Sequence, residues 1–82
     1  MKTFELFYFP SCPYCQMVLG ELNQLTVAVE LRNIMENIDY RNELMAGGGK
    51  TQVPCLKIVD AESVTWMYES RDIIHYLQQQ AS

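Results

Sequence analysis

The sequence predicts an α/β fold in which a mixed four-stranded sheet carries helices on both faces. Segments of continuous or alternating apolar residues alternate with segments whose apolar residues recur at helical spacing, in the order β-α-β-α-β-β-α. The first two strands flank a helix, so a right-handed crossover should pair them in parallel. The last two strands are close enough in sequence to form a hairpin. Helices on both faces of one sheet make a three-layer sandwich.

The length and the charge of the chain limit what it can be. Eighty-two residues suffice for one domain with one modest core, which we expect to span residues 1–82 as a monomer. The net charge of −4 argues against nucleic acid or an anionic membrane surface as a partner. No apolar run approaches the ~20 residues that span a bilayer, and the first strand starts too early for a signal peptide. We therefore expect a cytoplasmic protein.

The predicted elements cover, in chain order, residues 3–8, 13–25, 26–34, 38–46, 53–59, 64–67 and 70–77. In the first strand, Phe4 and Leu6 alternate with polar residues before an aromatic run, which indicates burial on both faces. The first helix carries Val18, Leu22 and Leu25 at helical spacing. The second strand is rich in β-branched and apolar residues.

The second half of the chain contains clear start and stop signals. Asn37 can cap the second helix, and the glycines at 47–49 should end it and give a flexible approach to the third strand. Pro54 stands at the start of that strand, where a missing N–H is tolerated. Ser70 can cap the last helix. We expect the buried side of the second helix to consist of Ile38, Leu44 and Met45.

The stretch Ser11–Cys15, with the sequence S-C-P-Y-C, is the strongest functional signal. Cys12 lies where a strand passes into a helix, and Pro13 suits the first helical position. A sulfur at a helix N-terminus faces unpaired N–H groups and the positive end of the helix dipole, which favours thiolate over thiol. The sequence therefore predicts chemistry at Cys12.

Two structural uses of this cysteine pair are less favoured. A zinc site needs about two more ligands, and Cys55 and His75 offer no second paired spacing. A structural disulfide that closes so short a loop would remove little chain entropy. An odd cysteine count in a chain without a secretory signal also favours catalytic or metal-binding sulfur. We interpret Cys55 as an inert buried thiol and His75 as a solvent-facing residue.

The C-P-Y-C motif, the V-P pair about forty residues later and the order of elements resemble a glutaredoxin of the thioredoxin fold, over essentially the whole chain. This resemblance implies that Cys12 is the nucleophile and Cys15 the resolving thiol of a thiol–disulfide oxidoreductase. It implies glutathione as reductant and co-substrate, disulfide-containing or glutathionylated proteins as partners, and neither a tightly bound cofactor nor a metal.

The resemblance also implies a glutathione site. The peptide bond before Pro54 would be cis, and the backbone of Val53 would pair with the cysteinyl backbone of the bound peptide. Gln52 replaces the threonine that is usual before the V-P pair. Tyr14 would line the groove, and Arg41 would pair with the glycine carboxylate of glutathione, although by itself it could equally be a solvated helix residue.

Two positions depart from the glutaredoxin pattern. Phe9 replaces a lysine that many glutaredoxins carry three residues before the first cysteine. Glu69 and Ser70, at the start of the last helix, resemble instead the N-terminal domain of glutathione transferases, in which this pair holds the γ-glutamyl end of glutathione. Asp72 is a second candidate for the acidic group, and Ser70 could equally be a simple helix cap.

Three alternatives remain open. The chain could be a thioredoxin-type electron donor reduced by a flavoprotein reductase, although Arg41, Glu69 and Ser70 argue against it. It could be a glutathione-binding module of the transferase kind. It could also carry an iron–sulfur cluster through Cys12, which the stiff Pro13 and the competing Cys15 make the least favoured.

Overall fold

The computed structural model describes residues 2–81 of the chain. Its elements are β1 (Thr3–Tyr8), α1 (Pro13–Leu22), β2 (Glu30–Asn33), α2 (Ile38–Gly48), β3 (Cys55–Val59), β4 (Val64–Met67) and α3 (Ser70–Ala81). Their order and type agree with the prediction. None of the described helices is both long and apolar enough to cross a membrane.

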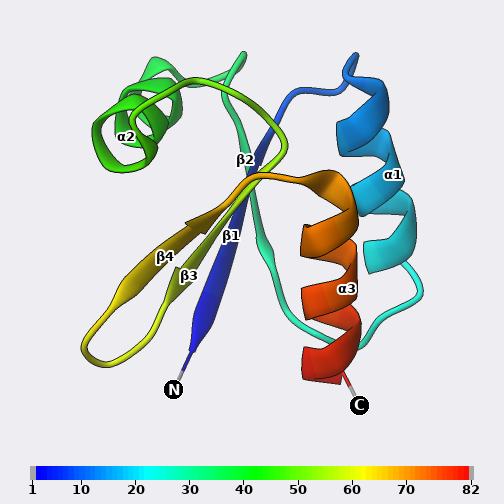
Figure 1. Ribbon diagram of the computed structural model, residues 1–82. Helices are drawn as coiled ribbons and strands as arrows, with labels where there is room; N and C mark the ends of the chain where they lie inside the picture. The colour runs from blue at the N-terminus through cyan, green and yellow to red at the C-terminus, as the bar shows by residue number, and fades with distance from the viewer. Residues whose placement is uncertain (1, 82) are drawn as a thin grey trace.

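The four strands form one mixed sheet in the order β2-β1-β3-β4. Strand β1 pairs in parallel with β2 and antiparallel with β3, and β3 forms a hairpin with β4, as the sequence predicts. Figure 1 shows α1 and α3 next to each other on one side of the sheet and α2 on the other side. The architecture is the thioredoxin-like α/β fold.

The strand directions place the segments that follow β1 and precede β3 at the same end of the sheet. Strands β1 and β2 both end there, because they are parallel, and β3 begins there, because it is antiparallel to β1. Cys12 follows β1 and Pro54 directly precedes β3, whose first residue Cys55 pairs with Phe7. Two segments that lie far apart in the sequence therefore meet at this edge.

Each face of the sheet has its own apolar cluster. On the face covered by α1 and α3, the buried members are Phe4, Leu6, Val18, Leu56, Ile58, Ile73 and Leu77. On the α2 face, the cluster is smaller and consists of Phe7, Ile34, Leu44 and Cys55. Because hydrophobic stabilisation scales with the apolar area removed from water, the larger cluster contributes more of it.

A charged network supports α2 where the apolar cluster is small. The guanidinium group of Arg32 forms ion pairs with Glu5, Glu30 and Glu43, at 2.5 Å between Arg32 Nη1 and Glu43 Oε1. The ammonium group of Lys57 lies 2.7 Å from Glu43 Oε2. Glu43 belongs to α2, whereas its two cationic partners belong to β2 and β3. These ion pairs therefore link the helix to the sheet.

Several boundaries differ from the prediction, and β3 begins at Cys55 rather than at residue 53, so that Pro54 precedes the strand. Helix α1 ends at Leu22 rather than at residue 25, and β2 covers only Glu30–Asn33 rather than residues 26–34. The apolar side chains between them, Leu25, Val27 and Val29, pack against the cluster on the α1–α3 face. Their apolar character reflects this packing and not pairing with β1.

The glycines after residue 46 have a different role from the predicted one. Gly47 and Gly48 belong to α2, and only Gly49, at φ +82°, adopts the left-handed conformation that ends the helix. A Cβ atom on Gly47 would lie 2.1 Å from Trp66 Cζ2, and one on Gly48 would lie 1.9 Å from Tyr68 Oη. These two glycines allow the helix to approach β4 and the residue that follows it.

Other details of the helices also differ. Of the three residues expected on the buried side of α2, only Leu44 is buried, whereas Ile38 and Met45 are 61% and 48% exposed. Ion pairs and glycine contacts replace a broad apolar stripe there. Ser70 is the first residue of α3, and the carbonyl of the preceding Glu69 accepts a hydrogen bond from the Ile73 N–H at 2.9 Å. The helix continues to Ala81, beyond its expected end.

Candidate active site

Cys12 is the N-cap residue of α1, with Pro13 as the first helical residue, as predicted. Its sulfur accepts a hydrogen bond from the backbone N–H of Cys15, at 3.4 Å. Its own N–H donates to the carbonyl of Phe9 at 3.2 Å, which fixes the turn between β1 and α1. The sulfur that the sequence favours as nucleophile therefore receives an N–H group from the first turn of the helix.

Cys15 lies one turn further along α1 and is completely buried. Burial, with a smaller contribution from the neighbouring Cys12, raises the pKa of its thiol to about 12, while the backbone of Phe9 opposes the shift. Cys12, Cys15 and Cys55 are all free thiols in this structure. The arrangement provides one cysteine at the N-terminal end of the helix, 7% exposed, and a second thiol one turn further along that burial keeps protonated.

A pocket of about 220 Å³ opens beside this cysteine pair, between the starts of α1 and α3 and the segment before β3. The bond between Val53 and Pro54 in that segment is cis, as the resemblance to glutaredoxins implies. The pocket is lined by Tyr14, Gln52, Val53, Pro54, Tyr68, Glu69 and Ser70. It thus brings together six of the seven residues that we expected to bind glutathione.

Arg41 is the seventh expected residue, and it does not line the pocket. Its side chain is exposed on α2. Another cation, Lys50, lies next to a residue of the pocket lining, because its ammonium nitrogen is 4.4 Å from the centre of the Tyr68 ring. Lys50 was not singled out from the sequence, since a lysine after three glycines carries no motif by itself.

Tyr68 was also missed by the sequence analysis, although it directly precedes the Glu69–Ser70 pair. Its hydroxyl oxygen is buried and forms no hydrogen bond with any described residue. It lies close enough to the Cys55 thiol for each group to affect the ionisation of the other. Burial raises the pKa of Cys55 to about 11, while Tyr68 and Lys50 act in the opposite direction. A buried, protonated thiol agrees with an inert Cys55.

The lining of the pocket is polar, and its one charged side chain is that of Glu69. Within residues 2–81, no group of three or more histidine, cysteine or acidic residues is placed to hold a metal ion. His75 is exposed on α3 and contacts Gln79. The polar groups that line the pocket are one carboxylate, hydroxyls, an amide side chain and the backbone at the start of α3.

Comparisons with solved structures show the same fold in other proteins. A Leishmania trimeric glutathione transferase superposes with a TM-score of 0.77 at 20% sequence identity, over 98% of this chain and 18% of that one. The thioredoxin-like protein BC3987 superposes with a TM-score of 0.69 at 26% identity, over 94% and 97% of the two chains. A glutaredoxin from Brucella melitensis superposes with a TM-score of 0.57 at 15% identity, over 95% and 79%.

These structural neighbours differ in size from one another. The chain spans less than a fifth of the Leishmania transferase and nearly the whole of the thioredoxin-like protein. No curated protein sequence matches it significantly. The family model described as "Glutathione S-transferase, N-terminal domain" matches residues 6–82, which is nearly the entire chain and includes both cysteines of the C-P-Y-C motif. The chain therefore belongs to the family of glutathione S-transferase N-terminal domains.

Proposed function

We propose that this protein is a glutathione-dependent thiol–disulfide oxidoreductase that uses Cys12 as nucleophile. The observation that supports it most directly is the position of the Cys12 sulfur at the first turn of α1, beside a pocket lined by Val53, Pro54 and Glu69. A second thiol, Cys15, lies one turn away on the same helix. Conjugation of glutathione to an electrophile needs no pair of protein thiols, whereas such a pair is suited to disulfide exchange.

In the proposed reaction, the Cys12 thiolate attacks the glutathione sulfur of a mixed disulfide. The original S–S bond breaks, the substrate sulfur leaves as a thiolate and takes up a proton, and a Cys12–glutathione disulfide forms. The thiolate of a second glutathione then attacks this intermediate, which releases oxidised glutathione and regenerates Cys12. One free glutathione is thereby oxidised for each mixed disulfide reduced, and the glutathione half of the substrate becomes the other half of oxidised glutathione.

For protein disulfides, Cys12 forms a disulfide with one substrate sulfur and releases the other as a thiol. Cys15 then loses its proton and attacks Cys12, which releases the second substrate thiol and leaves a Cys12–Cys15 disulfide. Two glutathione molecules reduce that disulfide. Because burial holds Cys15 protonated, we expect this route to be slower than the glutathione route.

The pocket suits the three parts of glutathione. The backbone of Val53 can pair with the cysteinyl part, as in a short β-ladder. Glu69 can accept a hydrogen bond from the γ-glutamyl ammonium group, and the N-terminus of α3 with Ser70 can bind the adjacent carboxylate. Tyr14 and Gln52 complete the lining. The glycine carboxylate then needs a cation at the other end of the pocket.

A coupled assay tests this proposal. The protein is incubated with hydroxyethyl disulfide, glutathione, glutathione reductase and NADPH, and NADPH oxidation is followed. We expect turnover that depends on Cys12 and on glutathione. Absence of turnover with glutathione, together with turnover when thioredoxin reductase replaces the glutathione system, would identify a thioredoxin-type donor, which the similarity to BC3987 makes the second candidate.

A second assay separates disulfide exchange from conjugation, the reaction that the family name suggests. The same preparation is incubated with glutathione and 1-chloro-2,4-dinitrobenzene, and thioether formation is measured. We expect little conjugation above the uncatalysed rate. Conjugation that exceeds disulfide reduction and survives a Cys12→Ser substitution would contradict the proposed function.

A further inference from the structure

Strand β4 forms one edge of the sheet. The strand order β2-β1-β3-β4 gives it a neighbour, β3, on one side only within the described part of the chain. At the turn that precedes β4, the N–H of Asp60 donates to the carbonyl of Ser63 at 2.9 Å, and hydrogen-bonded and non-bonded pairs alternate from there along an antiparallel ladder. Counted along the register with β3, Val64 and Trp66 are the residues of β4 in non-bonded pairs. Their N–H and C=O groups therefore point away from β3, toward the open edge.

The two edges of the sheet differ in how well they resist pairing with another strand. Strand β2 carries the charged side chains of Glu30 and Arg32, and charges on an edge strand discourage pairing. Strand β4 has the sequence V-T-W-M, without charge, proline or bulge, and Val64 in it is 50% exposed. Valine, threonine and tryptophan all favour strands. Figure 1 shows the β3–β4 hairpin extending away from the three helices, which leaves its outer edge accessible to a further strand.

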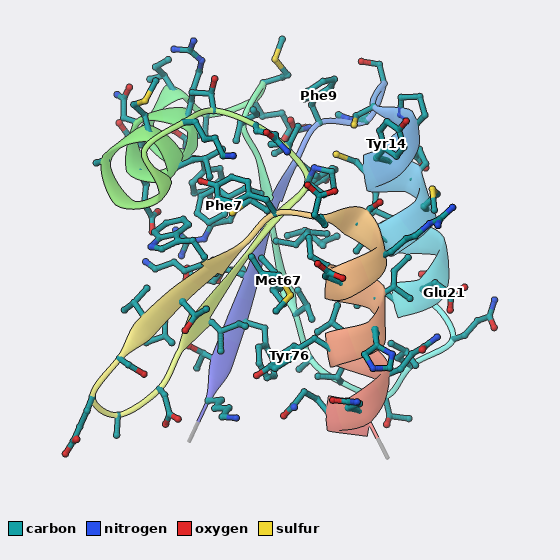
Figure 2. The ribbon with its side chains drawn as sticks, in the orientation of Figure 1. Phe7, Phe9, Tyr14, Glu21, Met67 and Tyr76 are labelled. Carbon is teal, nitrogen blue, oxygen red and sulfur yellow. The ribbon has the colours of Figure 1, made fainter. Side chains whose placement is uncertain are left out.

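The open edge of β4 is complementary to a second copy of itself. In an antiparallel pair of β4 strands, Val64 of each copy faces Trp66 of the other, and each facing pair exchanges two backbone hydrogen bonds. Thr65 then faces its own counterpart across the two-fold axis. Figure 2 shows Phe7 and Met67 on opposite faces of the sheet. Trp66 packs against Phe7, so Val64 and Trp66 share the α2 face, where they form an apolar cross-strand pair in each half of the interface.

Charge complementarity also favours a second copy as the partner. In this register Glu62, in the turn before β4, comes opposite Tyr68 of the second copy. The ammonium nitrogen of Lys50 lies 4.4 Å from the centre of the Tyr68 ring. Glu62 has the same spacing along the strand as Val64 and therefore lies toward the α2 face, where Tyr68 packs. Each copy thus brings one carboxylate toward one ammonium group of the other, twice by symmetry.

The other charges around this edge do not change that balance. Asp60 would approach the start of α3 of the second copy, where Arg71 and Asp72 are both exposed and opposite in charge. Lys57, on the neighbouring strand β3, is already paired with a carboxylate of α2 at 2.7 Å. Glu69 lines the glutathione pocket. The contact between Glu62 and Lys50 is therefore the one that charge selects.

We propose that β4 is a self-association surface, and that two copies of this chain pair through antiparallel β4 strands into one continuous sheet. A single strand pair buries less than the about 1,200 Å² that stable complexes need, and the net charge of −4 on each copy opposes association. The dimer is therefore weak and reversible, and dilute protein is monomeric, as the length of the chain leads us to expect. The inference is independent of the proposed function, because it needs neither Cys12 nor glutathione.

Sedimentation velocity tests the proposal. The parent is measured with a reducing agent present, which excludes disulfide-linked dimers, at concentrations up to about 1 mM, and we expect a Kd on the order of 0.1 mM. Thr65→Lys and Thr65→Glu each place like charges face to face across the axis, so each should raise the Kd roughly threefold or more. An equimolar mixture of the two places lysine opposite glutamate, and should dimerise at least as tightly as the parent.

Controls separate the edge from general effects of charge. Thr26→Lys makes the same change in net charge at an exposed threonine outside β4, and should leave the Kd unchanged. Glu62→Lys lowers the net negative charge, yet should raise the Kd roughly threefold or more, because it places two ammonium groups together. Adding Lys50→Glu to Glu62→Lys restores the opposite charges and should restore the parent Kd. Circular dichroism checks that each variant folds.

Each outcome decides one part of the proposal. A parent that stays monomeric at about 1 mM would overturn self-association. A dimer that Thr65→Lys and Thr65→Glu leave intact, or that their mixture does not restore, would show that another surface pairs and would overturn the role of β4. A dimer that is sensitive to Thr65 but not to Glu62→Lys would overturn the register. Disulfide reduction in dilute solution does not enter any of these results, so the proposed function stands or falls separately.

Discussion

The ammonium group of Lys50 lies 4.4 Å from the centre of the Tyr68 ring, directly beside the pocket that contains Glu69 and Ser70. A cation over an aromatic face is held by the negative potential of the ring. Lys50 therefore has a defined position at the pocket although it is exposed and lies just after the last glycine of α2. Arg41, which the sequence suggested for the glycine carboxylate, lies outside the pocket lining.

Substitution of Lys50 and Glu69 tests how the pocket holds glutathione. A charge-assisted hydrogen bond is worth roughly 1.5–3 kcal/mol net, so Lys50→Ala and Glu69→Ala should each raise the KM for glutathione about tenfold or more. Arg41→Ala is the matched control for loss of a positive charge, and we expect a smaller effect. The KM is measured in the coupled assay, and alkylation of Cys12 by a neutral reagent should change little. If Arg41→Ala has the larger effect, the family position binds glutathione instead.

The division of labour between the cysteines gives a second prediction. Cys12→Ser should abolish all disulfide reduction, because the attacking sulfur is lost. Cys15→Ser should retain reduction of glutathione mixed disulfides and lose at least tenfold in the reduction of protein disulfides, because only that route needs a resolving thiol. Both activities are measured with purified variants. Loss of both activities in Cys15→Ser, with one retained in Cys12→Ser, would reverse the assigned roles.

The close approach of α2 to β4 predicts how glycine substitutions affect stability. A new methyl group at Gly47 would clash with Trp66, and one at Gly48 with Tyr68, so each alanine variant should lower the free energy of unfolding by about 1–3 kcal/mol. Gly20→Ala in α1 is the control, since its Cβ would meet nothing within 4 Å. There alanine should stabilise the protein by about 0.5–1 kcal/mol. Urea unfolding of the three variants checks these opposite signs.

The buried thiols predict a loss of stability at alkaline pH. Burial raises the pKa of Cys55 from 9.0 to about 11, so between these values the folded chain keeps a proton that the unfolded chain loses. In this range the folded state binds more protons than the unfolded state. The contribution of Cys55 to the free energy of unfolding is therefore greatest below pH 9 and decreases as the pH rises to about 11. Cys15 contributes in the same direction up to about pH 12.

Replacement of Cys55 isolates its share of this effect. Urea unfolding is measured from pH 8 to pH 11 for the parent and for Cys55→Ala, and the slopes of stability against pH are compared. The variant should show a smaller decrease and keep most of its disulfide reductase activity. An unchanged slope would show that the Cys55 thiol has the same pKa in the folded and unfolded states. A tenfold loss of activity in the folded variant would show that this thiol takes part in catalysis.

The sequence by itself determined the order of the elements and the position of Cys12 at the start of a helix. The period of the apolar residues distinguishes strands from helices, and Pro13 after Cys12 marks a helix start, because both signals are local in the chain. The Glu69–Ser70 pair could also be recognised, since it stands next to a helix start. Each of these features depends on residues that lie within a few positions of one another in the chain, so the sequence alone is enough to recognise it.

Only the tertiary structure decided which residues face the pocket and why α2 has its composition. The positions of Lys50 and Tyr68 depend on the approach of the end of α2 to β4 and the start of α3, which lie well beyond it in the chain. In the sequence, Gly47 and Gly48 indicate the end of a helix. In the structure they belong to α2 and leave room for Trp66 and Tyr68. The exposure of Ile38, Met45 and Arg41 follows from the ion pairs of Glu43, which replace an apolar stripe beneath α2. Such contacts depend on packing between elements, which periodicity along one element does not specify.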